Sequence, residues 1–370
     1  MAASSWRTKE DRRWLRPGAS VDPAFLFLTL LLLAVGLVML YSASSAQSLY
    51  DTGYTVSTRY LQKQAFCAVI GLGAMWLFSR IPADFWYRFA WPLYGISIVL
   101  LLLVLVAGES VNGARRWINI AGIQFQPSEV AKFTMIVLFA RLTKGFGSDA
   151  RMFRYGVLGF GAALMGILVP LALEKHLSAI MLMGMVAVVM MYVAGTHPKW
   201  LLAGAGAAAL FVLVYITFMG YAGDRVTAWL HPEQDPGDTG YQILQSLYAI
   251  GSGGLFGLGF GKSRQKYLYL PFQYNDYIFA IICEELGLVG ALLIICLFAA
   301  LISRGYWIAL RASDRFSTVL AAGLVTLIAV QTILNLCVVT NLLPSTGIAL
   351  PFFSYGGTAL AVNLGEMGIV

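Results

Sequence analysis

The sequence predicts an all-α polytopic membrane protein with about ten transmembrane helices. Of its 370 residues, 59% are apolar and only 12% are charged, whereas soluble domains carry about 25% charged residues. The mean hydropathy is +0.75, and apolar runs long enough to cross a hydrocarbon core of about 30 Å recur along the whole chain. These observations exclude a soluble globular domain. The net charge of +7 does not indicate nucleic-acid binding, because the basic residues lie in loops between the apolar runs.

Ten apolar segments are predicted to span the bilayer. The first is too long for the core of a signal peptide and lacks a small-residue cleavage site, so we expect it to stay as a helix. The tenth runs to the final residue with no basic tail behind it, so the chain is expected to be truncated there. One transmembrane domain, 23–370, therefore follows a short segment, 1–22. The predicted spans are 23–43, 63–79, 90–107, 127–142, 155–173, 177–194, 200–219, 277–303, 317–341 and 348–370.

The distribution of Lys and Arg assigns the two sides of the membrane. Fifteen of these residues lie on the side of the amino terminus and ten on the other side, where four fall in one long loop. Long loops contribute little to the positive-inside rule, so the comparison is fifteen against six. We therefore predict a cytoplasmic N-terminal segment and, between helices 7 and 8, a large extracellular loop at 220–276.

This outer loop is the longest connection in the predicted topology. It has 57 residues, and loops of such length tend to be functional or disordered. A solvated linker is one interpretation. However, its stretch "GYQILQSLYAIGSGGLFGLGFG" is strongly apolar, which favours half-inserted helices and re-entrant turns that line a cavity.

Asp276 lies where the long loop meets the eighth predicted span, at the outer boundary between water and lipid. Two interpretations stay open, because Asp is a common N-cap at the start of a helix and a partly desolvated carboxylate also suits a general base. Glu284 and Glu285 follow about 12 Å deeper, at ~1.5 Å per helical residue. We expect them to pair with polar groups of other helices, because they lie too deep for a bulky extracellular substrate.

A second polar site follows the outer stretch "VNGARRWINIAGIQF". The fourth span begins at "QPSE", with Glu129 and Lys132 three residues apart, so the two share one helix face and can form an ion pair. An unpaired charge inside the bilayer is costly. The pair either holds two helices together or lines a polar cavity, and both roles are compatible.

Polar residues also interrupt the tenth predicted span. The stretch "NLLPSTGIALPFFSYGGTALAVN" carries several hydroxyl side chains and small residues. Close helix packing explains such residues, and so does the polar wall of a cavity. On the second interpretation, Ser354 and Tyr355 are candidate substrate contacts.

Taken together, these stretches resemble the SEDS membrane proteins, the family that includes FtsW, RodA and SpoVE. The similarity runs in the family's order from Tyr41 to the end of the chain. The matching motifs are "YSASS" at 41–45, "GARRWI" at 113–118, "QPSEVAKF" at 126–133, "GYQILQSLYAIGSGGLFGLGFGKSRQKYLYLP" at 240–271, "NDYIFAIICEELG" at 275–287 and "LLPSTGIALPFFSYGG" at 342–357.

The resemblance implies a bacterial plasma-membrane glycosyltransferase that polymerises lipid II into peptidoglycan strands beside a class B penicillin-binding protein. It implies a role in division, elongation or sporulation. It also places the family's essential outer aspartate at Asp276 and its buried ion pair at Glu129 and Lys132. A lipid II flippase or ion-coupled transporter is the alternative, since buried carboxylates suit a proton relay. A non-catalytic scaffold for cell-wall enzymes is another.

Two departures from the family pattern distinguish this chain. Relatives commonly have an acidic residue and a His in the hexapeptide that ends at the aspartate, where this chain has Phe272 and Tyr274. Between spans five and six, "EKHLSA" at 174–179 replaces a common Asp-Leu-Gly.

Lipid II polymerisation would release an undecaprenyl pyrophosphate, whose charge needs compensation. The outer face supplies basic residues for this, Arg115, Arg116, Arg225, Lys262, Arg264 and Lys266. The candidates for direct phosphate contact are Arg115, Arg116, Arg225 and Lys262. We expect Mg²⁺ or Mn²⁺ to bind with low affinity, mainly through the substrate phosphates, with Asp276 as at most one protein ligand. His176 and His231 are isolated in the sequence, so both are expected to be solvated loop residues rather than metal ligands.

Overall fold

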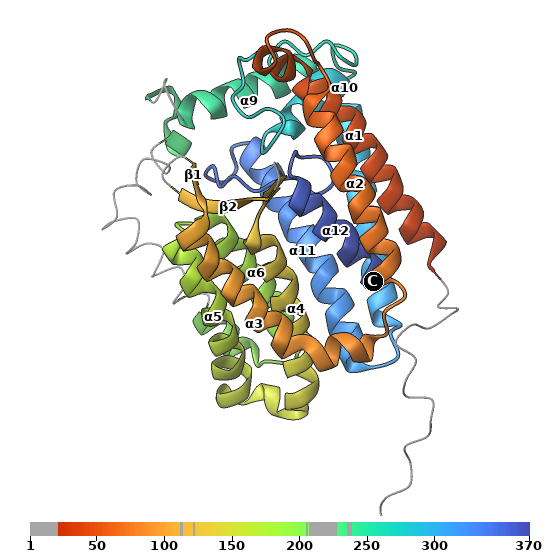
Figure 1. Ribbon diagram of the computed structural model, residues 1–370, viewed down its shortest axis with the longest axis vertical. Helices are drawn as coiled ribbons and strands as arrows, with labels where there is room; N and C mark the ends of the chain where they lie inside the picture. The colour runs from red at the N-terminus through yellow and green to blue at the C-terminus, as the bar shows by residue number, and fades with distance from the viewer. Residues whose placement is uncertain (1–20, 112–113, 121–122, 205, 207–227, 235–238) are drawn as a thin grey trace, which may run out of the picture.

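The computed structural model has the polytopic helical fold that the sequence predicts (Figure 1). It describes residues 21–111, 114–120, 123–204, 206, 228–234 and 239–370. Six of the described helical segments are long and apolar enough to cross a membrane, and Leu177–Val193 is a shorter apolar helix. The α-helices are α1 Pro23–Asp51, α2 Arg59–Phe78, α3 Ala83–Ala107, α4 Pro127–Phe146, α5 Phe160–Leu173, α6 Leu177–Val193, α9 Thr239–Gly253, α10 Ile278–Leu310, α11 Arg315–Val339 and α12 Gly357–Ile369.

Short polar signals fix where several of these helices begin. The carboxylate of Asp22 accepts a hydrogen bond of 2.9 Å from the backbone N–H of Phe25, and Pro23 occupies the first helical position of α1. Asp314 caps α11 in the same way, accepting from the N–H groups of Phe316 and Ser317. The predicted spans at 23–43 and 317–341 therefore correspond to real helices with slightly different ends.

Two apolar cores hold the bundle together. One joins α3, α4, α5, α6 and α11, and the other joins α1, α10, α11, α12 and the loop that leads into α10. In Figure 1 the helices run roughly along the long axis of the molecule, with α9 lying across one end. We call this the α9 end; it also carries the turn-rich segment 254–277.

Helix α10 is broken near its start by Gly287, whose φ is +66°. The break frees backbone groups that a straight helix would bond internally, and the loop after α9 pairs with them. The N–H groups of Leu258 and Gly259 donate to the carbonyls of Glu284 and Glu285, at 2.9 and 3.0 Å. These hydrogen bonds satisfy the backbone groups that the break leaves unpaired inside a membrane helix, where lipid offers no hydrogen-bonding partners.

The tenth predicted span, 348–370, is wrong over its first part. Residues 341–356 form an irregular segment, and α12 contains only the 13 residues Gly357–Ile369. Gly347 and Phe352 have φ values of +67° and +66°, outside the range that a right-handed helix allows. We call residues 346–356 the re-entrant segment.

A small antiparallel sheet forms between α3 and α4, where the sequence predicted only a loop. Its strands are β1 Glu109–Val111, β2 Ala114–Ile120 and β3 Ile123–Phe125, in the order β1-β2-β3. The seventh predicted span, 200–219, lies mostly outside the described residues, although 198–204 are helical. The long outer loop contains a short 3₁₀ turn, Pro232–Gln234, and the helix α9.

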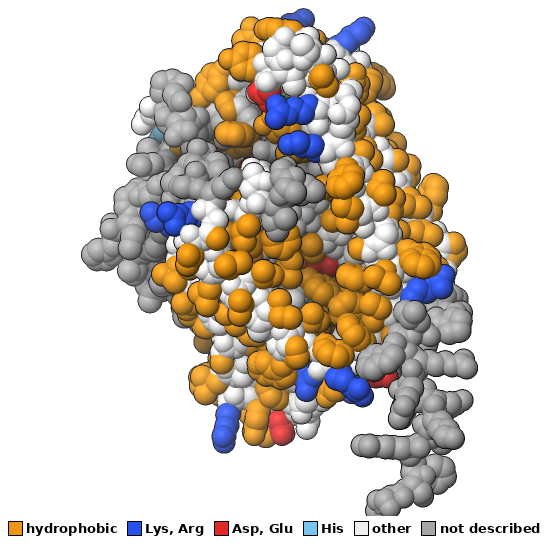
Figure 2. All heavy atoms as spheres, viewed as in Figure 1, with side chains coloured by type: hydrophobic (Ala, Val, Ile, Leu, Met, Phe, Trp, Pro, Cys, Tyr) orange, Lys and Arg blue, Asp and Glu red, His pale blue; other side chains and the backbone are white. Residues whose placement is uncertain are grey.

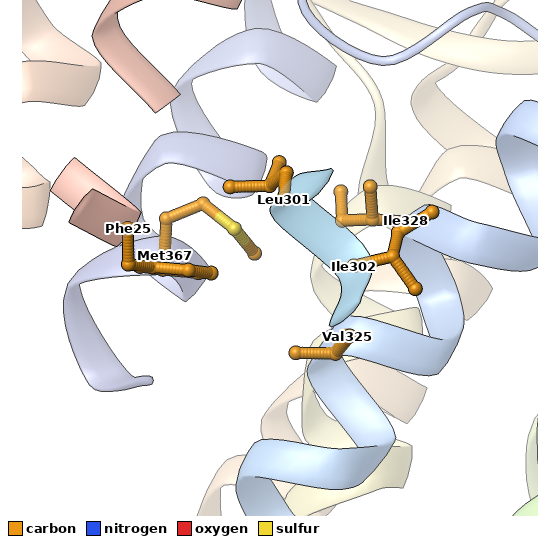
Figure 3. Close-up of a pocket in the computed structure, with 6 residues that line it drawn as sticks. All are labelled: Phe25, Leu301, Ile302, Val325, Ile328 and Met367. Atoms are coloured by element: carbon orange, nitrogen blue, oxygen red, sulfur yellow. The ribbon is translucent and has the colours of Figure 1, made fainter. Parts of the chain in front are cut away.

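An apolar crevice lies far from the α9 end, between α1, α10, α11 and α12 (Figure 3). Every side chain that lines it is apolar, so it offers no group for acid–base or phosphate chemistry. Its lining residues are Phe25, Leu301, Ile302, Val325, Ile328 and Met367.

Candidate active site

Asp276 lies at the α9 end, in the last turn before α10, and its side chain is partly exposed. It is not the N-cap of that helix, because Tyr277 occupies the cap position. The capping interpretation is therefore wrong. A Cβ atom on Gly347 would lie 3.2 Å from Asp276 Oδ2, so the re-entrant segment approaches this carboxylate closely. The φ of +67° at this position also favours glycine.

Glu284 is buried and fastens the loop that precedes Asp276. Its carboxylate accepts hydrogen bonds from the N–H groups of Arg264 and Gln265, at 3.0 and 3.3 Å, and from the hydroxyl of Ser263. The hydroxyl of Ser252, on α9, lies 3.4 Å away. A carboxylate that accepts several backbone donors holds a loop from inside. The main partners of Glu284 therefore lie in this loop, and not on other helices as expected from the sequence.

Glu285 is also fully buried and bonds in a second direction. The Ser42 hydroxyl on α1 lies 2.7 Å from both carboxylate oxygens, and the Lys266 ammonium lies 3.1 Å from Oε1. Lys266 is only 3% exposed, although the sequence suggested an outer basic residue. Its charge is already compensated inside the protein, so Lys266 is not available as a phosphate contact.

The ion pair expected from the spacing of Glu129 and Lys132 is present on α4. The Lys132 ammonium lies 2.7 Å from Glu129 Oε2, and both side chains are buried. Glu366, on α12, is 1% exposed and lies within electrostatic range of both charges. The pair therefore belongs to a cluster of three ionisable groups that joins α4 and α12.

Glu174 and His176 lie in the turn between α5 and α6, and both are buried. The prediction of a solvated His176 is therefore wrong, whereas His231 is exposed beside Glu233. Burial raises the pKa of Glu174 to about 8, with the charge of Arg116 acting in the opposite direction. Burial, together with the charges of Arg116 and Lys132, lowers the pKa of His176 to about 3. Both side chains are thus mainly uncharged at neutral pH.

Arg115 and Arg116 are neighbours on strand β2, so their side chains leave opposite faces of the sheet. The exposed Arg115 donates to the carbonyl of Leu105, at 3.0 Å, and Arg116 donates to the carbonyl of Lys175, at 2.5 Å. The two guanidinium groups therefore point to different surroundings. Arg116 reaches the α5–α6 turn, and Arg115 reaches the end of α3.

Lys262 is exposed in the turn-rich segment 254–277. Within the described part of the chain its ammonium makes no ion pair or hydrogen bond, so it is accessible to an anion. Arg225 lies outside the described residues. Figure 2 shows Lys and Arg side chains toward the two ends of the molecule, with apolar side chains covering most of the surface between.

Ser354 and Tyr355 lie on the re-entrant segment beside the loop that carries Asp276. Ser354 is 5% exposed. Its hydroxyl is already hydrogen-bonded to two backbone groups, so we do not expect it to contact a substrate directly. Tyr355 is half-buried and packs with Tyr60 and Tyr274, with ring centroids 5.0 and 5.9 Å away. Of these two sequence candidates, Tyr355 alone has a surface that a substrate can reach.

The described residues contain no group of three or more His, Cys, Asp or Glu side chains that could hold a metal ion. Mg²⁺ usually keeps several waters and binds through one or two carboxylates together with substrate phosphates. The partly exposed Asp276 carboxylate fits that role as a single ligand.

Comparison with known proteins identifies the family. The family model for FtsW, RodA and SpoVE, described as cell cycle protein, matches residues 23–370. The chain belongs to this family. It is 38% identical to a probable peptidoglycan glycosyltransferase FtsW of Trichlorobacter lovleyi, over 95% of this chain and 92% of the relative. It is also 38% identical to the stage V sporulation protein E of Bacillus subtilis, over 95% of this chain and 96% of the relative.

Solved structures agree with this membership. One described as "Structural coordination of polymerization and crosslinking by a peptidoglycan synthase complex" superposes with a TM-score of 0.80 at 28% identity, covering 95% of this chain and 96% of the other. The rod shape determining protein RodA of Thermus thermophilus superposes with a TM-score of 0.69 at 26% identity, covering 94% and 95%. The resemblance seen in the sequence motifs is therefore confirmed.

Several polar residues at the site were not singled out from the sequence of this family member. Asn335, Gln64 and Glu366 are 0%, 0% and 1% exposed. Each lies within an apolar predicted span, where a polar residue signals a specific partner. The polar residues could therefore have been noticed in the sequence. Their partners could not have been identified, because these partners lie far away in the sequence.

Proposed function

We propose that this chain is a peptidoglycan glycosyltransferase that polymerises lipid II on the outer face of the bacterial plasma membrane. The family membership and the names of the relatives support the reaction class. The observation that carries the assignment to a site is the partly exposed carboxylate of Asp276, held at the end of a membrane bundle among buried scaffold contacts.

In this reaction the 4-hydroxyl of one sugar attacks the anomeric carbon of another, and undecaprenyl pyrophosphate leaves. The C–O bond to the pyrophosphate breaks as the new glycosidic bond forms, and the attacking hydroxyl loses its proton. Asp276 accepts that proton as general base. One base suffices for such a displacement, because the pyrophosphate is already a good leaving group and needs no proton.

The leaving pyrophosphate needs positive charge near it in a low-dielectric groove. Lys262 and Arg115 are exposed at the α9 end and supply such charge. A divalent cation, Mg²⁺ or Mn²⁺, would add charge compensation by binding mainly through the substrate phosphates, and Asp276 would be at most one protein ligand. The lipid tails stay in the bilayer beside the helices.

The α9 end faces outward in this proposal, and the amino terminus lies in the cytoplasm. The loops at the opposite end carry the larger share of Lys and Arg, which supports that orientation. The partner is a class B penicillin-binding protein that cross-links the strands. The similarity to a chain in a complex of polymerisation and crosslinking supports a partner of this kind.

The test is polymerisation of labelled lipid II by the purified protein and its partner transpeptidase in detergent with Mg²⁺. Detergent micelles have no two sides, so polymer formation cannot arise from transport. We expect wild type and the matched control Asp84→Asn, an exposed acid at the opposite end, to make polymer, and Asp276→Asn to make none. Absence of polymer from the wild-type complex would favour a flippase or scaffold, and full activity of Asp276→Asn would remove the base assignment.

A further inference from the structure

We propose that Asn335 and Ser354 are positioning residues, which hold the Asp276 carboxylate through the backbone that carries it. The inference rests on the proposed function, because it explains how the general base is kept in place. It arises from three successive peptide carbonyls, those of residues 274–276, each of which accepts a hydrogen bond from a different donor outside the loop. No side chain of the loop itself takes part in these three bonds.

The first two donors belong to the re-entrant segment. The backbone N–H of Tyr355 donates to the carbonyl of Tyr274, at 2.9 Å. The hydroxyl of Ser354 donates to the carbonyl of Asn275, at 2.6 Å, and accepts from the N–H of Leu350, at 2.8 Å. We call residues 271–277, which lead into α10 and carry Asp276, the catalytic loop. The Ser354 hydroxyl thus connects the re-entrant segment to the catalytic loop by one donated and one accepted hydrogen bond.

The third donor is Asn335 on α11, which is fully buried. Its side-chain amide donates to the carbonyl of Asp276, at 2.7 Å, and to the carbonyl of Ile348, at 2.8 Å. Both partners are carbonyls, so the amide nitrogen must face them and the orientation of the side chain is fixed. One amide group therefore ties the catalytic loop and the re-entrant segment to the rigid helix α11.

The re-entrant segment is itself anchored to α2. The buried Gln64 donates to the carbonyl of Ser354 and accepts from the N–H of Gly356, both at 3.1 Å. An irregular backbone inside a membrane protein needs such partners for its polar groups. The same contacts make the segment a stiff support rather than a free loop.

Backbone strain lies on both sides of this contact. Phe272, in the catalytic loop, and Phe352, in the re-entrant segment, have φ values of +54° and +66°. For non-glycine residues such conformations persist only where the surroundings enforce them, and they cluster at functional sites. Gly347 completes the contact, since its missing side chain lets the segment approach Asp276 Oδ2.

The structure therefore separates two roles that the sequence could not distinguish. Asp276 touches the substrate, whereas Asn335 and Ser354 act through Asp276 and touch only backbone. A displacement of a catalytic group by about 1 Å can lower the rate 10²-fold. Loss of either donor should thus lower kcat by about 10-fold to 100-fold, while KM for lipid II changes little.

The experiment measures kcat and KM for lipid II polymerisation, per mole of monodisperse complex, for four variants. Ser354→Ala removes the hydroxyl, Ser354→Thr keeps it, and Asn335→Leu replaces the amide with an apolar group of similar size. The matched control is Thr332→Val, because this buried hydroxyl on α11 bonds only a carbonyl of its own helix. We expect low kcat for Ser354→Ala and Asn335→Leu, recovery in Ser354→Thr, and wild-type kcat for Thr332→Val.

Wild type and Asp276→Asn run in the same assay and separate the two proposals. If the wild-type complex makes no polymer, the proposed function fails, and the positioning role fails with it. If wild type is active and Asp276→Asn is not, wild-type kcat in folded Ser354→Ala overturns the positioning role alone. A raised KM at unchanged kcat also overturns it, because Ser354 would then be a substrate contact. Should Asn335→Leu not fold, the Ser354 pair decides.

Discussion

The ammonium of Lys266 lies 3.1 Å from a carboxylate oxygen of Glu285, and neither side chain has appreciable contact with solvent. Lys266 lies in the turn-rich segment 254–277, and Glu285 lies on helix α10. The same ammonium also donates to the carbonyl of Gly261, at 2.6 Å. This buried pair closes the loop over α10 and sets the path that the chain follows toward Asp276.

Breaking that pair should destabilise the protein strongly. Lys266→Met or Glu285→Gln alone leaves one buried polar partner without its counterpart, and loss of one member of a buried pair costs about 3–5 kcal/mol. The double variant should recover part of this loss. The measurement is thermal unfolding in detergent for the two single variants and the double variant.

Lys144→Met is the matched control for this cycle. Lys144 also lies 3.1 Å from a carboxylate, that of Asp314, but the two side chains are 43% and 37% exposed. Exposed pairs contribute about 0–1 kcal/mol, so its melting temperature should stay close to wild type. Equal effects at the buried and exposed pairs would show that burial does not determine the contribution.

The pair of Glu129 and Lys132 should show an asymmetric response. Lys132→Met removes a cation that lies near two buried carboxylates, those of Glu129 and Glu366, whereas Glu129→Gln leaves that cation beside Glu366. We therefore expect Lys132→Met to be the more destabilising single change. The double variant should lose less stability than the sum of the losses in the two single variants, with a coupling energy of about 1–3 kcal/mol. If the losses of stability in the two single variants simply add up in the double variant, the two side chains do not stabilise each other.

The buried Glu174 should make stability depend on pH. Its pKa is about 8 in the folded protein and 4.5 as the ordinary value, so the folded state keeps a proton that the unfolded state releases. Its contribution to stability is therefore fully present below about pH 4.5 and is lost as the pH rises through about 8. Between pH 5 and 9 the melting temperature of wild type should fall further than that of Glu174→Gln. Glu233→Gln, an exposed acid, should keep the wild-type dependence.

The fold class could be predicted from the sequence because burial in lipid requires long apolar runs. The pair of Glu129 and Lys132 on α4 could be predicted as well, because two side chains three residues apart in a helix lie on the same face. The contact of Lys266 with Glu285 could not, since a turn-rich loop has no period that fixes which side chains meet. The sequence identified both residues but assigned Lys266 to the outer surface.

The re-entrant segment explains why the tenth span was predicted incorrectly. Its residues are as apolar as those of a helix, with Phe352 and Phe353 2% and 0% exposed, and a short apolar run does not distinguish a buried helix from other buried structure. Its carbonyls at Ile348 and Ser354 instead accept hydrogen bonds from Asn335 on α11 and Gln64 on α2. The sequence pattern predicts the contacts of a residue only where the contacting residues are close to it in the chain.

The last prediction concerns the basic residues and the metal. Arg115→Gln and Lys262→Gln should raise the apparent KM for lipid II and increase the Mg²⁺ concentration needed for half-maximal activity. The reason is that both side chains are exposed at the α9 end, where lost protein charge can be compensated only by more cation. Their melting temperatures should stay near wild type. The measurement is initial polymerisation rate across lipid II and Mg²⁺ titrations, with Arg225→Gln tested in the same way.

Arg116→Gln should differ from these variants, because its guanidinium also bonds the carbonyl of Lys175 and faces the buried Glu174. We expect a lower melting temperature together with any change in KM. Arg151→Gln, an exposed basic residue at the opposite end, is the control for a general loss of charge and should match wild type in both titrations. If Arg115, Arg116, Arg225 and Lys262 can each be replaced with no change in KM or metal dependence, the pyrophosphate is bound elsewhere and these residues do not compensate its charge.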